Sequence, residues 1–188
     1  MLTVLLGGAR CGKSALAVAI AQRSGRPVTF VATGEPLDAE FAERIDRHRA
    51  ERPSSWRTIE APTELDGALA QAGDRAVVII DCLTLWVANL LGRELAEATI
   101  VERASQIAQL ASARSSPVVV VSNEVGSGIV PADPLSRRYR DTLGRVNAAF
   151  AAHADEAFLV VAGRVVALSA WSGGLRFDGS DGSDGIGA

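Results

Sequence analysis

The residues from Gly7 to Ser14 carry the clearest chemical signal in the chain. They fit the phosphate-loop pattern G-x-x-x-x-G-K-[ST] at each fixed position, as Gly7, Gly8, Ala9, Arg10, Cys11, Gly12, Lys13 and Ser14. Backbone N–H groups of such a loop and the following helix N-terminus make an anion site. Lys13 would reach the β- and γ-phosphates of a nucleotide, and the Ser14 hydroxyl would bind Mg²⁺. We therefore expect the chain to bind a nucleoside triphosphate.

Asp81 is the second candidate for phosphate chemistry, and it directly follows the apolar run Val77–Ile80. A carboxylate at the C-terminal end of a buried strand holds Mg²⁺ in phosphate-loop proteins. We expect this strand to lie beside the strand that leads into the phosphate loop. The competing interpretation is an aspartate that caps a helix starting at Leu83.

Glu124 and a group of arginines are weaker candidates for substrate-side roles. Glu124 follows the apolar run Val118–Val121, and ligands gather at the carboxyl ends of strands in open α/β sheets. It could accept a proton from an attacking hydroxyl or bind metal through water, or simply begin a polar loop. Arg137, Arg138 and Arg140 open a predicted helix, where positive charge opposes the helix dipole. Bound phosphate or nearby carboxylates would offset that charge; a solvated helix face is the alternative.

His48 is one of two histidines and lies in an arginine-rich segment of a second predicted helix. Neutral imidazole is a competent nucleophile towards phosphorus, and the neighbouring arginines would favour the neutral form and bind phosphates. On these residues alone, a solvated surface histidine is the commoner interpretation.

Strand and helix signals alternate along the chain and position these residues. The expected strands are Leu2–Leu6, Val28–Ala32, Trp56–Glu60, Val77–Ile80, Val118–Val121, Phe158–Val161 and Val165–Leu168. The expected helices are Lys13–Arg23, Ala39–Glu51, Glu64–Gln71, Glu94–Arg114 and Leu135–Ala152. This pattern predicts a three-layer α/β P-loop NTPase (RecA-like) fold with a mostly parallel sheet. The short connection Ala162–Arg164 predicts an antiparallel hairpin at its C-terminal edge.

Composition bounds the chain's size, compartment and partners. We expect one domain over residues 1–171 and a disordered tail over 172–188, which is rich in Gly, Ser and Asp. The net charge of −3 argues against a general nucleic-acid binder. No apolar run reaches the length of a membrane span, and Met1–Leu6 has the pattern of a strand rather than a secretion signal. With two widely separated cysteines, these features predict a reduced, cytoplasmic protein.

Seven segments taken together resemble one family, the bifunctional adenosylcobinamide kinase/adenosylcobinamide-phosphate guanylyltransferases of cobalamin biosynthesis. The phosphate loop alone is generic, whereas two other segments are far more specific: Asp81–Leu91 and Asn123–Pro131. The remaining matches are Ala32-Thr33, Arg44-Ile45…His48, Trp56–Glu60 and Arg137–Asp141…Gly144…Asn147. In order, the matches span nearly all of residues 1–168.

The resemblance implies two reactions. One is phosphorylation of the aminopropanol hydroxyl of adenosylcobinamide with ATP or GTP. The other is transfer of GMP from GTP through a guanylyl-histidine, which would form on His48. The implied nucleotide contacts beyond the phosphate loop are Ala32, Thr33, Gly34, Ala50, Glu51, Arg52, Pro53, Glu60 and Asp81. A homotrimer is also implied. The alternatives are a single-activity small-molecule kinase and a nucleotide-dependent switch protein.

Overall fold

Seven strands form one sheet through the middle of the protein. A computed structural model describes residues 1–36, 43, 49 and 52–169. The sheet order is β3-β2-β4-β5-β1-β6-β7. The strands are β1 (Leu2–Gly7), β2 (Val28–Ala32), β3 (Arg57–Glu60), β4 (Val77–Asp81), β5 (Val118–Val121), β6 (Glu156–Val161) and β7 (Arg164–Ala167). All neighbouring strands are parallel except β6 and β7, which confirms the predicted antiparallel edge hairpin.

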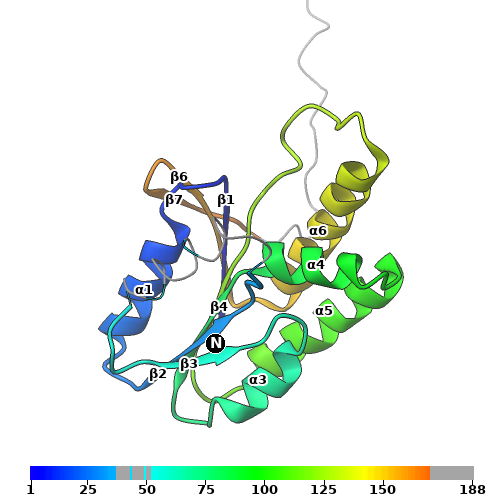
Figure 1. The fold of residues 1–188 in the computed structure, drawn as a ribbon. Coiled ribbons are helices and arrows are strands. Elements are labelled where there is room, and N and C mark those ends of the chain that lie inside the picture. The colour runs from blue at the N-terminus through cyan, green and yellow to red at the C-terminus, as the bar shows by residue number, and fades with distance from the viewer. Residues whose placement is uncertain (37–42, 44–48, 50–51, 170–188) are drawn as a thin grey trace, which may run out of the picture.

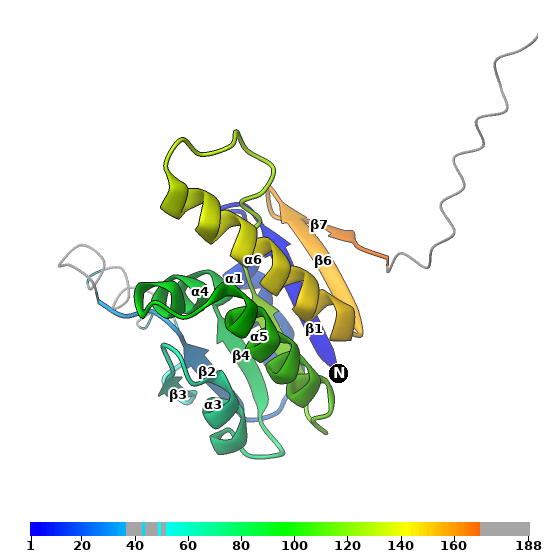
Figure 2. The same cartoon turned by 90° about the vertical axis from the view of Figure 1, so that its right-hand side faces the viewer.

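The described helices cover both faces of this sheet, which gives the predicted three layers (Figures 1 and 2). Helix α1 (Lys13–Arg23) lies on one face. The other face carries α3 (Leu65–Gln71), α4 (Leu83–Gly92), α5 (Glu97–Ser112) and α6 (Pro134–His153). The parallel strands therefore end at a common edge, where the loops that follow them meet.

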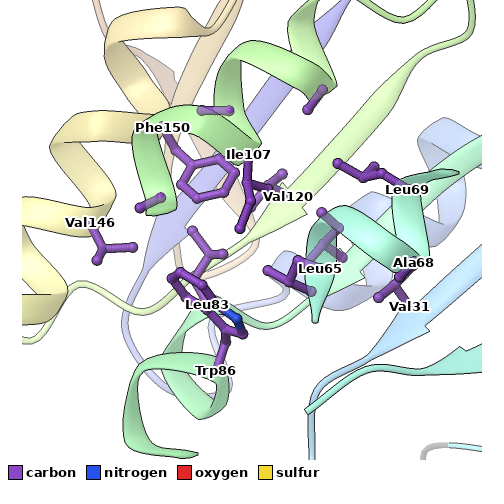
Figure 3. Close-up of a cluster of buried hydrophobic side chains, with 14 of the residues drawn as sticks. Val31, Leu65, Ala68, Leu69, Leu83, Trp86, Ile107, Val120, Val146 and Phe150 are labelled. Carbon is purple, nitrogen blue, oxygen red and sulfur yellow. The ribbon is translucent and has the colours of Figure 1, made fainter. Parts of the chain in front are cut away.

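The apolar strands are buried on both faces, which is why their sequences show runs rather than alternation. Val118 and Val120 of β5 belong to the larger core cluster, which also holds Trp86 and Phe150. Figure 3 shows those two rings facing the sheet from α4 and α6. The alternate residues of β5 join a second cluster with Ala17 and Ala21 of α1.

The strand order corrects one expectation about β4. This strand does not lie beside β1, because β5 pairs with both of them in parallel. A run of Val and Ile predicts a central strand, but it carries no information on which central position the strand takes. Asp81 nevertheless stays at the level of the phosphate loop, since Val121 is in register with both Leu5 and Asp81.

Helix boundaries show where sequence patterns were weak. Helix α4 was absent from the expected helices, although a helix start at Leu83 was considered; its almost uniformly apolar sequence gives no amphipathic pattern. Helix α5 begins at Glu97 rather than Glu94, because Glu94 has a φ of 60° and follows the end of α4. The expected helix Ala39–Glu51 lies mostly outside the described residues, and the tail 172–188 lies wholly outside them.

Candidate active site

Glycines shape the phosphate loop between β1 and α1. Gly7 has a φ of 151°, and a Cβ added there would lie 2.3 Å from the carbonyl oxygen of Val160. Gly12, with a φ of 106°, is the N-cap residue of α1 and has no side chain to bond the helix's first N–H groups. The first turn of α1 also has no acidic residue. The N-terminus of α1 is thus left without a side-chain cap or an acidic residue, as an anion-binding site requires.

Lys13 is held inside this loop. Its Nζ donates to the carbonyl oxygens of Gly7 at 3.0 Å and Gly8 at 2.6 Å, and the residue is 6% exposed. It is also the chain's single lysine. A phosphate oxygen bears more negative charge than a carbonyl oxygen and is a stronger partner for an ammonium group. Lys13 therefore lies within the loop, and its contact with nucleotide phosphates stays a prediction.

The loop after β5 meets the phosphate loop at one atom. The backbone N–H of Glu124 donates to the Gly7 carbonyl oxygen at 3.0 Å, the same oxygen that accepts from Lys13. The Glu124 carboxylate accepts from the N–H of Gly126. Two candidates far apart in sequence, Lys13 and Glu124, are thus brought together at the edge of the sheet.

Side chains from α4 and α6 hold the start of this loop. The N–H of Asn123 donates to Thr84 Oγ1 at 3.0 Å, and Asn147 Nδ2 donates to the Asn123 carbonyl oxygen at 3.0 Å. The hydroxyl of Tyr139 donates to the Thr84 carbonyl oxygen at 3.2 Å, and burial raises the pKa of Tyr139. Thr84, Tyr139 and Asn147 all lie in segments that carry the family resemblance, but their sequence alone indicates no role for them.

The ends of β2, β3 and β4 bring charged candidates together. Ala32 is in register with Glu60 on one side and with Asp81 on the other. The guanidinium of Arg52 stacks on the Phe30 ring, 3.5 Å from its centroid. Burial lowers the pKa of Arg52, while the charge of Asp81 acts in the opposite direction. These predicted nucleotide contacts therefore share one region, with Arg49 also paired to Glu60.

Thr33 ties two of these strand ends together. Its hydroxyl donates to the Cys82 carbonyl oxygen and accepts from the Cys82 N–H, both at 2.8 Å, and the residue is fully buried. Asn89 Nδ2 donates to the carbonyl oxygens of Thr33 at 2.8 Å and Pro62 at 3.1 Å. Asn89 was missed from sequence, although an amide within the apolar helix α4 was an available signal. The hydroxyl of Thr33 is thus engaged in holding the strand ends.

The arginines of α6 have partners within the chain. Arg138 bonds Glu97 at 3.2 Å, and Arg140 bonds the neighbouring Asp141 at 3.0 Å. Arg137 instead donates to the carbonyl oxygens of Pro131 and Ala132. Nearby carboxylates therefore balance the positive charges of Arg138 and Arg140. Arg137 holds the end of the β5–α6 loop.

Three of the predicted site residues, His48, Ala50 and Glu51, lie outside the described residues. Ser14 is in the first turn of α1 and Asp81 closes β4, so both lie at the same edge of the sheet. Hydroxyl and carboxylate oxygens are ligands that Mg²⁺ accepts, together with substrate phosphates and water. No group of three metal-binding side chains occurs in the part of the chain that the structure describes. Such a site fits a metal that arrives with the nucleotide.

The sequence matches those of known proteins that belong to one family. The sequence model of the family "Cobinamide kinase / cobinamide phosphate guanyltransferase" matches residues 3–168. The bifunctional adenosylcobalamin biosynthesis protein CobP of Pseudomonas aeruginosa is 41% identical over 166 residues, covering 87% of this chain and 94% of that protein. Its counterpart CobU of Escherichia coli is 39% identical over 176 residues, covering 87% and 97%.

A solved structure supports the fold class. The ATPase EscN of the enteropathogenic E. coli type III secretion system matches with a TM-score of 0.57 and 12% identity, over 86% of this chain and 43% of that chain. At that identity the likeness concerns the fold alone, and it supports the predicted P-loop NTPase (RecA-like) class. The family match over residues 3–168 and the 41% identity to CobP show that the chain belongs to the cobinamide kinase / cobinamide phosphate guanyltransferase family of enzymes.

Proposed function

We propose that this chain phosphorylates adenosylcobinamide with ATP or GTP and then transfers GMP from GTP to the product, giving adenosylcobinamide-GDP. The observation that carries the proposal is the junction at the Gly7 carbonyl oxygen, where Lys13 and the Glu124 backbone meet. It joins a phosphate-binding loop to a carboxylate-bearing loop, within a chain that belongs to a family with both activities.

In the first reaction, the aminopropanol hydroxyl attacks the γ-phosphorus of the nucleotide. A new O–P bond forms, the bond to the β-phosphate oxygen breaks, and the nucleoside diphosphate leaves. Lys13 stabilises the charge that develops on the phosphoryl oxygens, and Glu124 accepts the hydroxyl proton. Ser14 and Asp81 would hold Mg²⁺, which supplies charge neutralisation on the phosphates.

In the second reaction, His48 attacks the α-phosphorus of GTP and pyrophosphate leaves, so that a guanylyl-histidine forms. The phosphate of adenosylcobinamide phosphate then takes the GMP and frees the histidine. Lys13 serves here as well, since it stabilises the departing pyrophosphate. Contacts to the nucleotide would come from Ala32–Gly34, from residues 50–53, and from Glu60 and Asp81.

The proposed assembly is a homotrimer. Strand β7 is an edge strand whose residues are all exposed, with Val165 at 47% and Val166 at 56%. Successive residues of a strand face opposite sides, so both faces of this apolar edge are open to a second copy. Light scattering of the protein in solution tests this assembly.

None of the described helices has the length and hydropathy of a membrane span, and the cytoplasmic location stays a prediction.

Incubation with α-labelled GTP, in the absence of corrinoid, tests the second reaction. We expect a protein adduct that is stable to alkali and lost in acid, as a phosphoramidate is. The His48→Ala variant should form none. His153→Ala is the matched control, since it removes the chain's other histidine, which lies at the end of α6 with Nε2 at 3.2 Å from Ser105 Oγ.

Three results decide between this mechanism and its rivals. An adduct that persists in His48→Ala contradicts the assignment of the acceptor. If no adduct forms at all while cobinamide-dependent ADP release continues, the chain is a kinase only. If added cobinamide leaves nucleotide hydrolysis unchanged and no adduct forms, a nucleotide-dependent switch is the better account.

A further inference from the structure

The β5–α6 loop exposes an apolar tip beside the phosphate site. Ile129 is 96% exposed and Val130 is 62% exposed, values far above those of the apolar core. These two adjacent aliphatic side chains are available for contact with a ligand, and their position next to the phosphate loop makes them a candidate binding surface. The loop rises from the carboxyl end of β5 at the same edge of the sheet as the phosphate loop (Figures 1 and 2).

Both ends of this loop are fixed. At its start, Asn123 is bonded by Thr84 and Asn147, and Glu124 is bonded to Gly7. At its end, Arg137 Nη1 donates to the carbonyl oxygens of Pro131 at 2.9 Å and Ala132 at 2.6 Å. Asp133 caps α6 by accepting from the Ser136 N–H at 2.8 Å. Hydrogen bonds thus fix both ends of the loop that carries the exposed tip.

The loop's chemistry suits a large ligand that is apolar on its faces and bears amides. No charged residue occurs between Glu124 and Asp133. The exposed residues of the segment are Gly126, Ser127, Gly128, Ile129, Val130 and Ala132, and its two largest exposed side chains are the aliphatic ones of Ile129 and Val130. A corrin ring offers methyl-rich faces and neutral carboxamide arms, which such a surface would contact through dispersion and backbone hydrogen bonds.

The position of the tip matches the reaction geometry as well. Ile129 is five residues after Glu124, so its Cα lies at most about 18 Å from the Cα of Glu124, whose N–H bonds the Gly7 carbonyl oxygen. In cobinamide the reacting hydroxyl sits at the end of a flexible arm, and the ring must rest one arm's length from the phosphates. An uncharged surface at that distance is where the ring would be received.

We propose that the β5–α6 loop docks the corrin ring of the cobinamide substrate, with Ile129 and Val130 as its apolar contacts. The proposal rests on the proposed function for the identity of the ligand. It goes further in naming the surface that selects a corrinoid as acceptor. The competing occupant of this tip is a neighbouring copy of the chain, and the experiment below separates the two.

The test measures binding of adenosylcobinamide itself, by equilibrium dialysis, together with the KM for adenosylcobinamide in the kinase assay. Ile129→Ala should raise both the dissociation constant and the KM about tenfold, because aliphatic contact area is lost. Ile129→Leu should restore most of the affinity. Leu110→Ala is the matched control, since Leu110 is 53% exposed on α5, outside this loop, and its truncation should change neither value.

Adduct formation from GTP and light scattering separate the failure of this proposal from the failure of the proposed function. Adduct formation from GTP alone involves no corrinoid, so its absence in the wild-type chain would count against the guanylyl-transfer mechanism while dialysis still tests the docking surface. Light scattering of Ile129→Ala should match the wild type. The inference is overturned if the affinity for adenosylcobinamide is unchanged in Ile129→Ala, or if the variant loses affinity together with its oligomeric state, which would make the tip a subunit contact.

Discussion

The phosphate loop and the β5–α6 loop leave neighbouring parallel strands at the same edge of the sheet, yet they are held in different ways. The phosphate loop is fixed by its own glycines and by Lys13, which bonds carbonyl oxygens five and six residues before it. The β5–α6 loop is fixed by side chains from elsewhere in the chain, with Thr84 39 residues and Asn147 24 residues away from Asn123.

The difference teaches that a functional site can combine a local module with a part built by tertiary packing. A local module needs particular residues at particular spacings, and a sequence motif records it. A packed loop needs buried polar partners, whose spacing along the chain depends on the fold. The predictions below test whether the two parts respond independently.

The largest effect is expected from Gly7→Ala in the phosphate loop. The added Cβ would lie 2.3 Å from the Val160 carbonyl oxygen, at a φ of 151°. We expect a loss of about 2–4 kcal/mol in unfolding free energy and loss of GTP binding. Urea denaturation and GTP titration measure the two.

Gly8→Ala is the matched control for this strain. An added Cβ at Gly8 meets no atom within 4 Å, and the expected change in stability is within about 0.5 kcal/mol. Equal stability of the two variants would show that the phosphate loop does not depend on the close approach at Val160.

A smaller effect is expected from Asn147→Ala, which acts on the other loop. Removal of the amide leaves the carbonyl oxygen of Asn123 without this donor and costs about 1–2 kcal/mol. GTP affinity should stay within about twofold of wild type, because the phosphate loop keeps its own supports, while kinase turnover should fall. A fall in GTP affinity as large as the fall in turnover would mean that the loops are not independent.

The smallest effect concerns the two cysteines. Burial, followed by the charge of Asp81, raises the pKa of Cys82 to about 11, so its thiol stays protonated and unreactive at pH 8. We expect iodoacetamide at pH 8 to modify Cys11 in the phosphate loop and to spare Cys82 until the chain is denatured. Bound GTP should slow the reaction of Cys11. Peptide mass spectrometry checks this, and rapid labelling of Cys82 in the folded protein would contradict it.

Much of the fold could be predicted from sequence because its central strands are buried on both faces. The runs Val28–Ala32 and Val118–Val121 match β2 and β5 at both ends. The order of the strands could not be predicted, since β4 and β5 are both runs of β-branched apolar residues and either could have paired with β1. Helix α4 is not among the expected helices, because its nearly uniform apolar sequence shows no amphipathic periodicity.

The candidate site likewise has parts that could be predicted from sequence and parts that depend on tertiary packing. The strand–loop–helix arrangement around the phosphate loop could be predicted, since the motif records local backbone geometry. The link from Glu124 to Gly7 could not be foreseen, because nothing in either segment encodes the pairing of their strands. Asn89 and Asn147 act only through distant carbonyl oxygens, so their roles become visible once the helices are packed.

The central claim is that one phosphate loop serves both reactions, and Lys13→Ala tests it most directly. Lys13 is the single lysine of the chain, and no second ammonium side chain exists to replace it. Cobinamide-dependent ADP release and pyrophosphate release from GTP should be measured separately in this variant. The account predicts that both rates fall by about 10²-fold or more. Pyrophosphate release at the wild-type rate, with kinase activity lost, would contradict it.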